Sequence, residues 1–179
     1  MTHRIILFRG MNTGGVRAAV SDLRAMAADM GLGNPRTLLA SGNLVVESGK
    51  ATAALEHDIE AAMEKTFGLK VAAMVRTPDQ WAKLVAANPF SDEAAAHPSR
   101  MVAMVMKDGI KAGALEACRQ LAAGGERVEA VGDVLYFWFP SGQGESGIFK
   151  KATPRLIGLG TGRNWNTVLK LADMVGLTR

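Results

Sequence analysis

The fold is decided first by the stretch RIILFR at residues 4–9. This stretch is short and apolar and contains two β-branched isoleucines, so it predicts a buried strand. A glycine-containing loop follows at residues 10–15. A helix is then expected with Ser21 as its N-cap, because Leu23 and Met26 recur at helical spacing. The chain therefore opens with a strand and a helix.

The next elements complete a recognisable unit. Residues 37–39 and 44–46 predict two strands, and residues 41–43 (Ser-Gly-Asn) have the chemistry of a turn between them. Apolar residues over 55–66 share one helical face, and residues 71–75 predict a fourth strand. The resulting order, βαββαβ, is that of a ferredoxin-like unit.

A similar order of elements then begins again. Thr77, Pro78 and Gln80 predict a helix start with a capping box. A polar connector at 91–100 leads to the elements of the repeat: a strand at 101–106, a helix at 115–122, strands at 128–131 and 134–139, an irregular glycine-rich segment at 140–164 and a helix at 165–175. We therefore expect an α+β protein of two ferredoxin-like (βαββαβ-type) units packed together, with mostly antiparallel sheets. Residues 1–76 form the first unit, and residues 77–179 form a second, degenerate unit with a C-terminal helix.

Composition narrows the class of protein. The 179 residues are 48% hydrophobic and 21% charged, as in an ordinary globular protein. The single cysteine, Cys118, excludes an intrachain disulfide and is interpreted as a buried thiol. No apolar run is long enough for a signal peptide or a membrane span, so we expect a cytoplasmic protein without a membrane partner.

Charge is concentrated near the C-terminus. The whole chain has a net charge of +4, whereas residues 150–179 hold six basic residues against one acidic residue. Such a segment attracts phosphate, and its alternative interpretation is a solvated basic surface.

Three loops are candidates for ligand contact. The loop at residues 10–15 follows a strand, and its glycines allow backbone N–H groups to approach an anion. The turn at 41–43 and the helix start at 163–167 are the other two, although a hairpin turn and a helix cap explain them as well. The residues expected to contact a ligand are Arg9, Gly10, Asn12, Gly14, Gly15, Ser41, Asn43, Arg163, Asn164 and Asn166.

Other motifs are less informative. The Gly-x-Gly-x-x-Gly run at 142–147 lacks the long helix, the parallel strand and the acidic residue of a dinucleotide site. Tyr136 and Trp138 share one strand face, where burial and stacking on a nucleic acid are the two interpretations. No metal-ligand spacing or nucleophile elbow occurs, and the four acids at 56–64 are interpreted as a solvated helix face.

Several of these segments together resemble the DUF1697 family, a domain of unknown function in uncharacterised bacterial proteins. The resemblance runs from about Ile6 to Leu171, and its carriers are Phe8–Asn12 with Gly14 and Gly15, Leu23 and Arg24, Ser41–Asn43, Asn88–Phe90, the glycine-rich run at 142–147 and Arg163–Thr167. It implies a two-lobed α+β fold and supplies no established activity, cofactor or catalytic residue.

Three functions remain open at this point, and one of them is a structural or regulatory module whose glycines only serve turns. The other two involve a ligand. One is binding of a phosphate-bearing ligand, such as a nucleotide, a nucleic acid or a phosphorylated metabolite, through the glycine-rich loops and the basic helix start. The other is an enzyme that acts on a small polar substrate in a cleft between the two units, with amide and guanidinium groups to stabilise negative charge.

Overall fold

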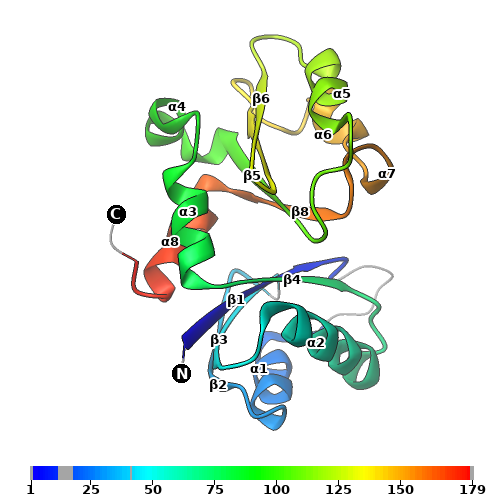
Figure 1. Cartoon of the computed structure of the whole chain (residues 1–179), viewed down its shortest axis with the longest axis vertical. Coiled ribbons are helices and arrows are strands. Elements are labelled where there is room, and N and C mark those ends of the chain that lie inside the picture. Colours follow the sequence, from blue (N-terminus) through cyan, green and yellow to red (C-terminus); the bar gives the residue numbers. More distant parts are fainter. Residues whose placement is uncertain (1, 12–17, 41, 178–179) are drawn as a thin grey trace. The chain divides into compact units, whose positions relative to one another are not determined.

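The computed structural model of the chain describes residues 2–11, 18–40 and 42–177. It contains two four-stranded antiparallel sheets with interleaved helices (Figure 1). Contacts between residues divide the chain into two compact units. The first unit contains the residues up to Ala82 together with those from Leu171 onward, and the second runs from Lys83 to Lys170.

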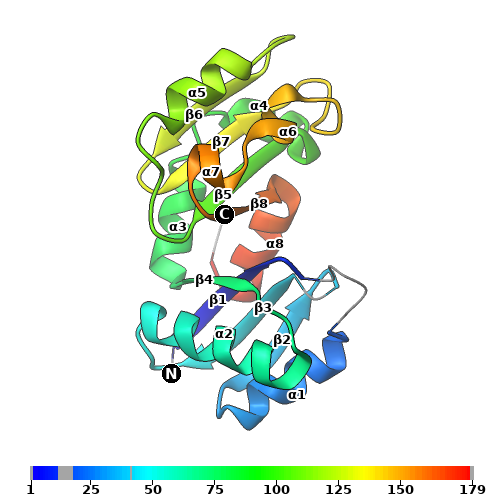
Figure 2. The same ribbon diagram turned by 90° about the vertical axis from the view of Figure 1, so that its right-hand side faces the viewer.

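The first unit is built on sheet A, whose strand order is β2-β3-β1-β4. Its elements are β1 (Thr2–Arg9), α1 (Val20–Asp29), β2 (Gly33–Leu38), β3 (Asn43–Ser48), α2 (Thr52–Phe67), β4 (Ala72–Arg76) and the first part of α3 (Pro78–Ala86). The helices α1 and α2 cover one face of the sheet (Figure 2). Leu23 of α1 and Ile59 of α2 are fully buried there against Ile6 and Leu44 of the strands. The predicted βαββαβ order is confirmed in this unit.

The second unit is built on sheet B, whose order β6-β7-β5-β8 matches that of sheet A. Its elements are α4 (Ser91–Ala96), a 3-10 turn (Pro98–Arg100), β5 (Met101–Met106), α5 (Ala114–Leu121), β6 (Arg127–Val131), β7 (Val134–Trp138), α6 (Gly147–Lys151), α7 (Pro154–Ile157), β8 (Gly160–Asn164) and α8 (Trp165–Met174). A two-residue turn at Gly132 and Asp133 joins β6 to β7. Phe137 of β7 and Cys118 of α5 lie in the core between sheet B and the helices α5, α6 and α7.

The strand β8 is the main difference from the sequence prediction, which expected an irregular segment at 140–164. β8 pairs with β5 from Met106 opposite Gly160 to Val102 opposite Asn164. A Cβ atom on Gly160 would lie 2.6 Å from Met106 Sδ and 2.8 Å from the Val105 carbonyl oxygen. The glycine therefore permits close approach of two strands, a role that sequence alone does not distinguish from that of a loop glycine.

Two smaller predictions were also wrong. The N-cap of α1 is Ala19, which has an extended backbone and accepts from Leu23 N at 2.9 Å, so Ser21 lies inside the first turn. The expected polar connector at 91–100 contains α4, with Asp92 and Glu93 in its first turn. Acids at that position and the alanines that follow them both favour a helix.

The division between the units passes through two helices. α3 begins after β4 in the first unit and ends in the second, whereas α8 begins after β8 in the second unit and ends in the first. Tyr136 Oη donates to the Leu84 carbonyl oxygen of α3 at 2.7 Å. Arg36 Nη2 donates to the Met174 carbonyl oxygen of α8 at 2.8 Å. Each helix is thus hydrogen-bonded to the sheet of the unit in which it ends. The predicted division of the chain into units 1–76 and 77–179 stays a prediction.

The edge strand β4 is closed by side chains of α2. Glu60 Oε2 accepts from Ala73 N at 2.9 Å, and Glu56 Oε2 accepts from Val75 N at 2.9 Å. The expectation of a solvated acidic face is therefore wrong for Glu56 and Glu60, which satisfy backbone donors that an edge strand leaves open. Glu64, one turn further along, has a side chain that is 58% exposed.

Candidate functional site

Two of the predicted loops of the first unit leave sheet A at the same edge. Phe8 N donates to the Gly42 carbonyl oxygen at 3.0 Å, which joins the end of β1 to the turn between β2 and β3. Gly10 has a φ of +89°, a left-handed conformation that explains why glycine stands there. We call the residues around Arg9, Gly10 and Gly42 the loop edge of sheet A.

The turn between β2 and β3 carries backbone strain. Leu39 and Ala40 have φ values of +49° and +40°. This left-handed region costs a residue with a Cβ atom about 1–2 kcal/mol. Asn43 is buried, and its Nδ2 donates to the Leu38 carbonyl oxygen at 3.1 Å, so its side chain holds the hairpin together.

Of the ligand contacts expected in the first unit, Arg9, Gly10 and Asn43 lie at or beside this edge. The remaining four, Asn12, Gly14, Gly15 and Ser41, lie outside the described residues. The other three predicted residues belong to the second unit and are described separately.

Arg163 lies on β8 and bonds to its own strand. Its Nη1 donates to Thr161 Oγ1 at 2.7 Å and to the Gly162 carbonyl oxygen at 2.9 Å. Burial lowers the pKa of Arg163 to about 10, because a desolvated guanidinium loses part of the hydration that stabilises its charge.

Asn164 and Asn166 begin the last helix. Asn164 Oδ1 accepts from Thr167 N at 3.1 Å, so Asn164 caps this helix. Asn166 is exposed in the first turn, and Trp165 is buried at 6% exposure. Because the cap occupies a free N–H group, an anion at this helix start competes with the protein's own side chain.

The glycine-rich run at 142–147 also has a local structural role. Ser146 is buried, and its Oγ accepts from Ile148 N at 3.1 Å, which begins α6. The burial interpretation of the aromatic strand holds for Tyr136, which is 0% exposed.

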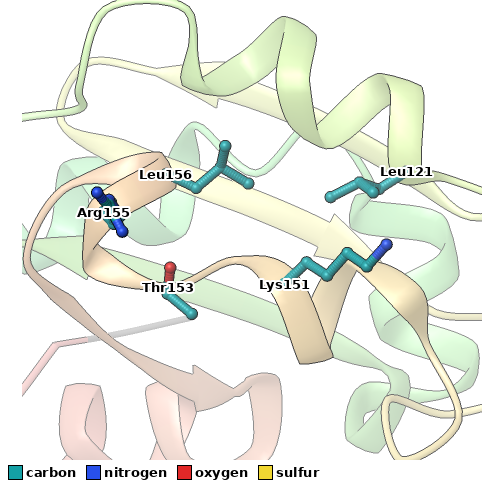
Figure 3. A pocket seen from close by; sticks show the side chains of 5 residues that line it. All are labelled: Leu121, Lys151, Thr153, Arg155 and Leu156. Carbon is teal, nitrogen blue, oxygen red and sulfur yellow. The ribbon is translucent and has the colours of Figure 1, made fainter.

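A pocket of about 370 Å³ lies beside α6 and α7 in the second unit. It is lined by Leu121, Lys151, Thr153, Arg155 and Leu156 (Figure 3). Lys151 ends α6 and Arg155 lies in α7, and the buried Ile148 and Ile157 hold these two short helices on the core. We call this site the basic pocket.

The polar side chains of the basic pocket have no partner within the described part of the chain. Lys151, Thr153 and Arg155 are exposed, and their side chains make no hydrogen bond or ion pair with any described residue. Lys111 adds a third cation nearby, since its Nζ donates to the Arg155 carbonyl oxygen at 2.5 Å. Positive charge and hydroxyl donors that are not already paired are what an anionic ligand needs.

The sequence did not single out these pocket residues. The only available signal was the basic segment after residue 150, which has no acid before Asp173. Leu121 stands about thirty residues earlier along the chain, and no periodicity relates it to Leu156.

Two further titratable groups are buried in the second unit. Burial raises the pKa of the Cys118 thiol, and it raises the pKa of Tyr136 to about 12. Both shifts favour the protonated form, which is the less nucleophilic one. Within the described ranges, no group of three or more His, Cys, Asp or Glu side chains is placed to hold a metal ion. Across the same ranges, no helix has the length and apolar character needed to span a membrane.

The fold defines a protein with two α+β units, each a four-stranded antiparallel sheet of ferredoxin-like strand order. The chain belongs to the family described as "Protein of unknown function (DUF1697)", whose match covers residues 1–136. It is similar in fold to the conserved bacterial protein SP0830 from Streptococcus pneumoniae, with 20% sequence identity and a TM-score of 0.75 over 97% of this chain and 98% of that chain. A search of curated proteins found no match. The residues of the basic pocket other than Leu121 lie beyond the family match.

Proposed function

We propose that this protein binds a small phosphate-bearing ligand and that the basic pocket is where it does so. The observation that carries the proposal is that two cations, Lys151 and Arg155, line one pocket with the hydroxyl of Thr153, and that none of these side chains has a partner among the described residues. A phosphate accepts several charge-assisted hydrogen bonds at once, and an arginine fork and a lysine ammonium are its usual donors. The pocket volume of about 370 Å³ is in the range of small-molecule sites.

The loop edge of sheet A remains the second proposed place for such a ligand. Arg9 and Gly10 end β1 there, beside a turn with two left-handed residues. The test must therefore separate the two places. It must also separate small phosphates from nucleic acid.

The test is a thermal-shift screen of the full chain against nucleotides and phosphorylated metabolites, followed by calorimetric titration of the hits. A ligand at a hundred times its dissociation constant adds about 2.7 kcal/mol to the free energy of unfolding, which for a chain of this size raises Tm by roughly 5–10 °C. The double variant Lys151→Met/Arg155→Met should weaken binding by roughly ten- to a hundredfold, because two solvent-exposed bonds of about 0.7–1.4 kcal/mol each together contribute about 1.4–2.8 kcal/mol.

The matched control is Lys83→Met/Lys170→Met, which removes the same charge from exposed positions outside the pocket. Equal weakening in both double variants would mean that only net charge matters, and it would contradict the pocket. Loss of binding in Arg9→Met alone would move the site to the loop edge. Binding of an oligonucleotide that falls steeply with salt would identify nucleic acid as the ligand.

A further inference from the structure

The basic pocket has an apolar side as well as a cationic one. Leu121 and Leu156 extend toward each other from α5 and α7 (Figure 3). Both side chains pack against the core of the second unit with one side and remain partly exposed on the other. Partly exposed leucines in a pocket offer area that a ligand can remove from water.

The cationic side is formed by a separate segment. Lys151, Thr153 and Arg155 follow one another at alternate positions between the end of α6 and the middle of α7. The polar side chains of the pocket therefore come from one short segment, and the two leucines lie beside them. An anion without an apolar group would contact the polar side chains and leave the leucines exposed to water.

We infer that the ligand is an amphipathic phosphate monoester, with its phosphate bound at the cationic rim to which Lys151 and Arg155 belong and a short apolar group against Leu121 and Leu156. This inference rests on the proposed function and goes one step further, because it names the chemical class that fits the whole lining. The proposal commits to a soluble compound, because a volume of about 370 Å³ lies in the range of small-molecule sites.

The experiment is a calorimetric titration of the full chain with inorganic phosphate, methyl phosphate, butyl phosphate and hexyl phosphate. Each methylene removed from water contributes about 0.8 kcal/mol when fully buried, equivalent to roughly a fourfold gain in affinity. Because the two leucines are only partly buried, we expect a gain of about two- to fourfold per methylene from methyl to butyl phosphate.

Two variants assign the gain to the pocket. Leu156→Ala should flatten the dependence on chain length and leave the affinity for methyl phosphate unchanged. Leu159→Ala is the matched control, because Leu159 is 37% exposed and lies outside the pocket lining. The series on the unaltered chain decides the question even if Leu156→Ala folds poorly.

Each of the remaining outcomes of the titrations would contradict a different part of the proposal. Methyl and hexyl phosphate that bind equally well would overturn the apolar part and leave the proposed function intact. Binding of none of the esters would overturn both. Hexanol that binds as tightly as hexyl phosphate would remove the role of the phosphate. Binding to phosphatidylglycerol vesicles without binding to hexyl phosphate would replace the soluble ligand by a lipid surface.

Discussion

Tyr136 is the single tyrosine of the chain, and its side chain is fully buried on β7. Its hydroxyl donates to the Leu84 carbonyl oxygen at 2.7 Å. The sequence placed this residue on a strand and favoured burial, but it carried no sign of the acceptor, which lies 52 residues away. A buried phenol with one hydrogen bond thus ties β7 to the end of α3.

Alkaline titration of Tyr136 tests this arrangement. Burial raises the pKa of Tyr136 to about 12, so absorbance near 295 nm should change around that pH in the folded protein and near the ordinary tyrosine pKa of about 10 in urea. The raised pKa means that the protonated phenol stabilises the fold below pH 10, and this contribution is lost as the pH rises through about 12. A native titration near pH 10 would contradict the buried hydrogen bond.

At the scale of elements, capping and turn chemistry were readable in the sequence. Thr77 N donates to Gln80 Oε1 at 2.9 Å and Gln80 N donates to Thr77 Oγ1 at 3.2 Å, which is the capping box predicted for α3. Such bonds join residues three apart, so local sequence contains both partners. β8 was missed because the reason for its glycines lies on β5, more than fifty residues earlier.

The glycine in β8 has a measurable consequence. Gly160→Ala should lower the free energy of unfolding by about 1–3 kcal/mol, because its Cβ meets the Val105 carbonyl oxygen, which belongs to the backbone. Gly144→Ala is the control, since nothing lies within 4 Å of its Cβ position. Urea unfolding followed by circular dichroism measures both. Equal stability of the two variants would contradict the close pairing of β5 and β8.

The closure of β4 by α2 gives a second prediction for an element. Glu60→Ala leaves the N–H of Ala73 without the acceptor at 2.9 Å, so we expect a loss of roughly 1–3 kcal/mol in the free energy of unfolding. Glu64→Ala on the same helix should change it by less than about 0.5 kcal/mol, as is usual for exposed positions. A Glu60 variant as stable as the Glu64 variant would show that water replaces the carboxylate at no cost.

At the scale of the whole molecule, α3 and α8 link the two units through continuous helices. Unfolding of either unit would disrupt a helix that the other unit also uses, so we expect one cooperative transition in urea. Of the three tryptophans, Trp81 belongs to the first unit and Trp138 and Trp165 belong to the second, so the fluorescence transition should coincide with that of circular dichroism. Glu60→Ala should lower the midpoint of both signals equally. Two separated transitions would mean that the units unfold independently.

The candidate site was predictable only in part at this scale. The sequence identified the basic C-terminal segment and the glycine loops, and the structure brings Gly10 and Gly42 to one edge of sheet A. The sequence did not reveal the basic pocket, because Leu121 on α5 lines the same pocket as Lys151 and Arg155 only through the tertiary packing of α6 and α7. Asn43, Asn164 and Ser146 proved to hold turns and helix starts, roles that their sequence patterns share with ligand binding.

The most direct test of the account is calorimetric titration of a phosphate monoester into the unaltered chain, Lys151→Met/Arg155→Met and Lys83→Met/Lys170→Met. We expect saturable binding to the unaltered chain and to the control, and a roughly ten- to a hundredfold weaker affinity for the pocket variant. Absence of binding to the unaltered chain, or equal affinity for all three proteins, would contradict the assignment of the basic pocket as a phosphate site.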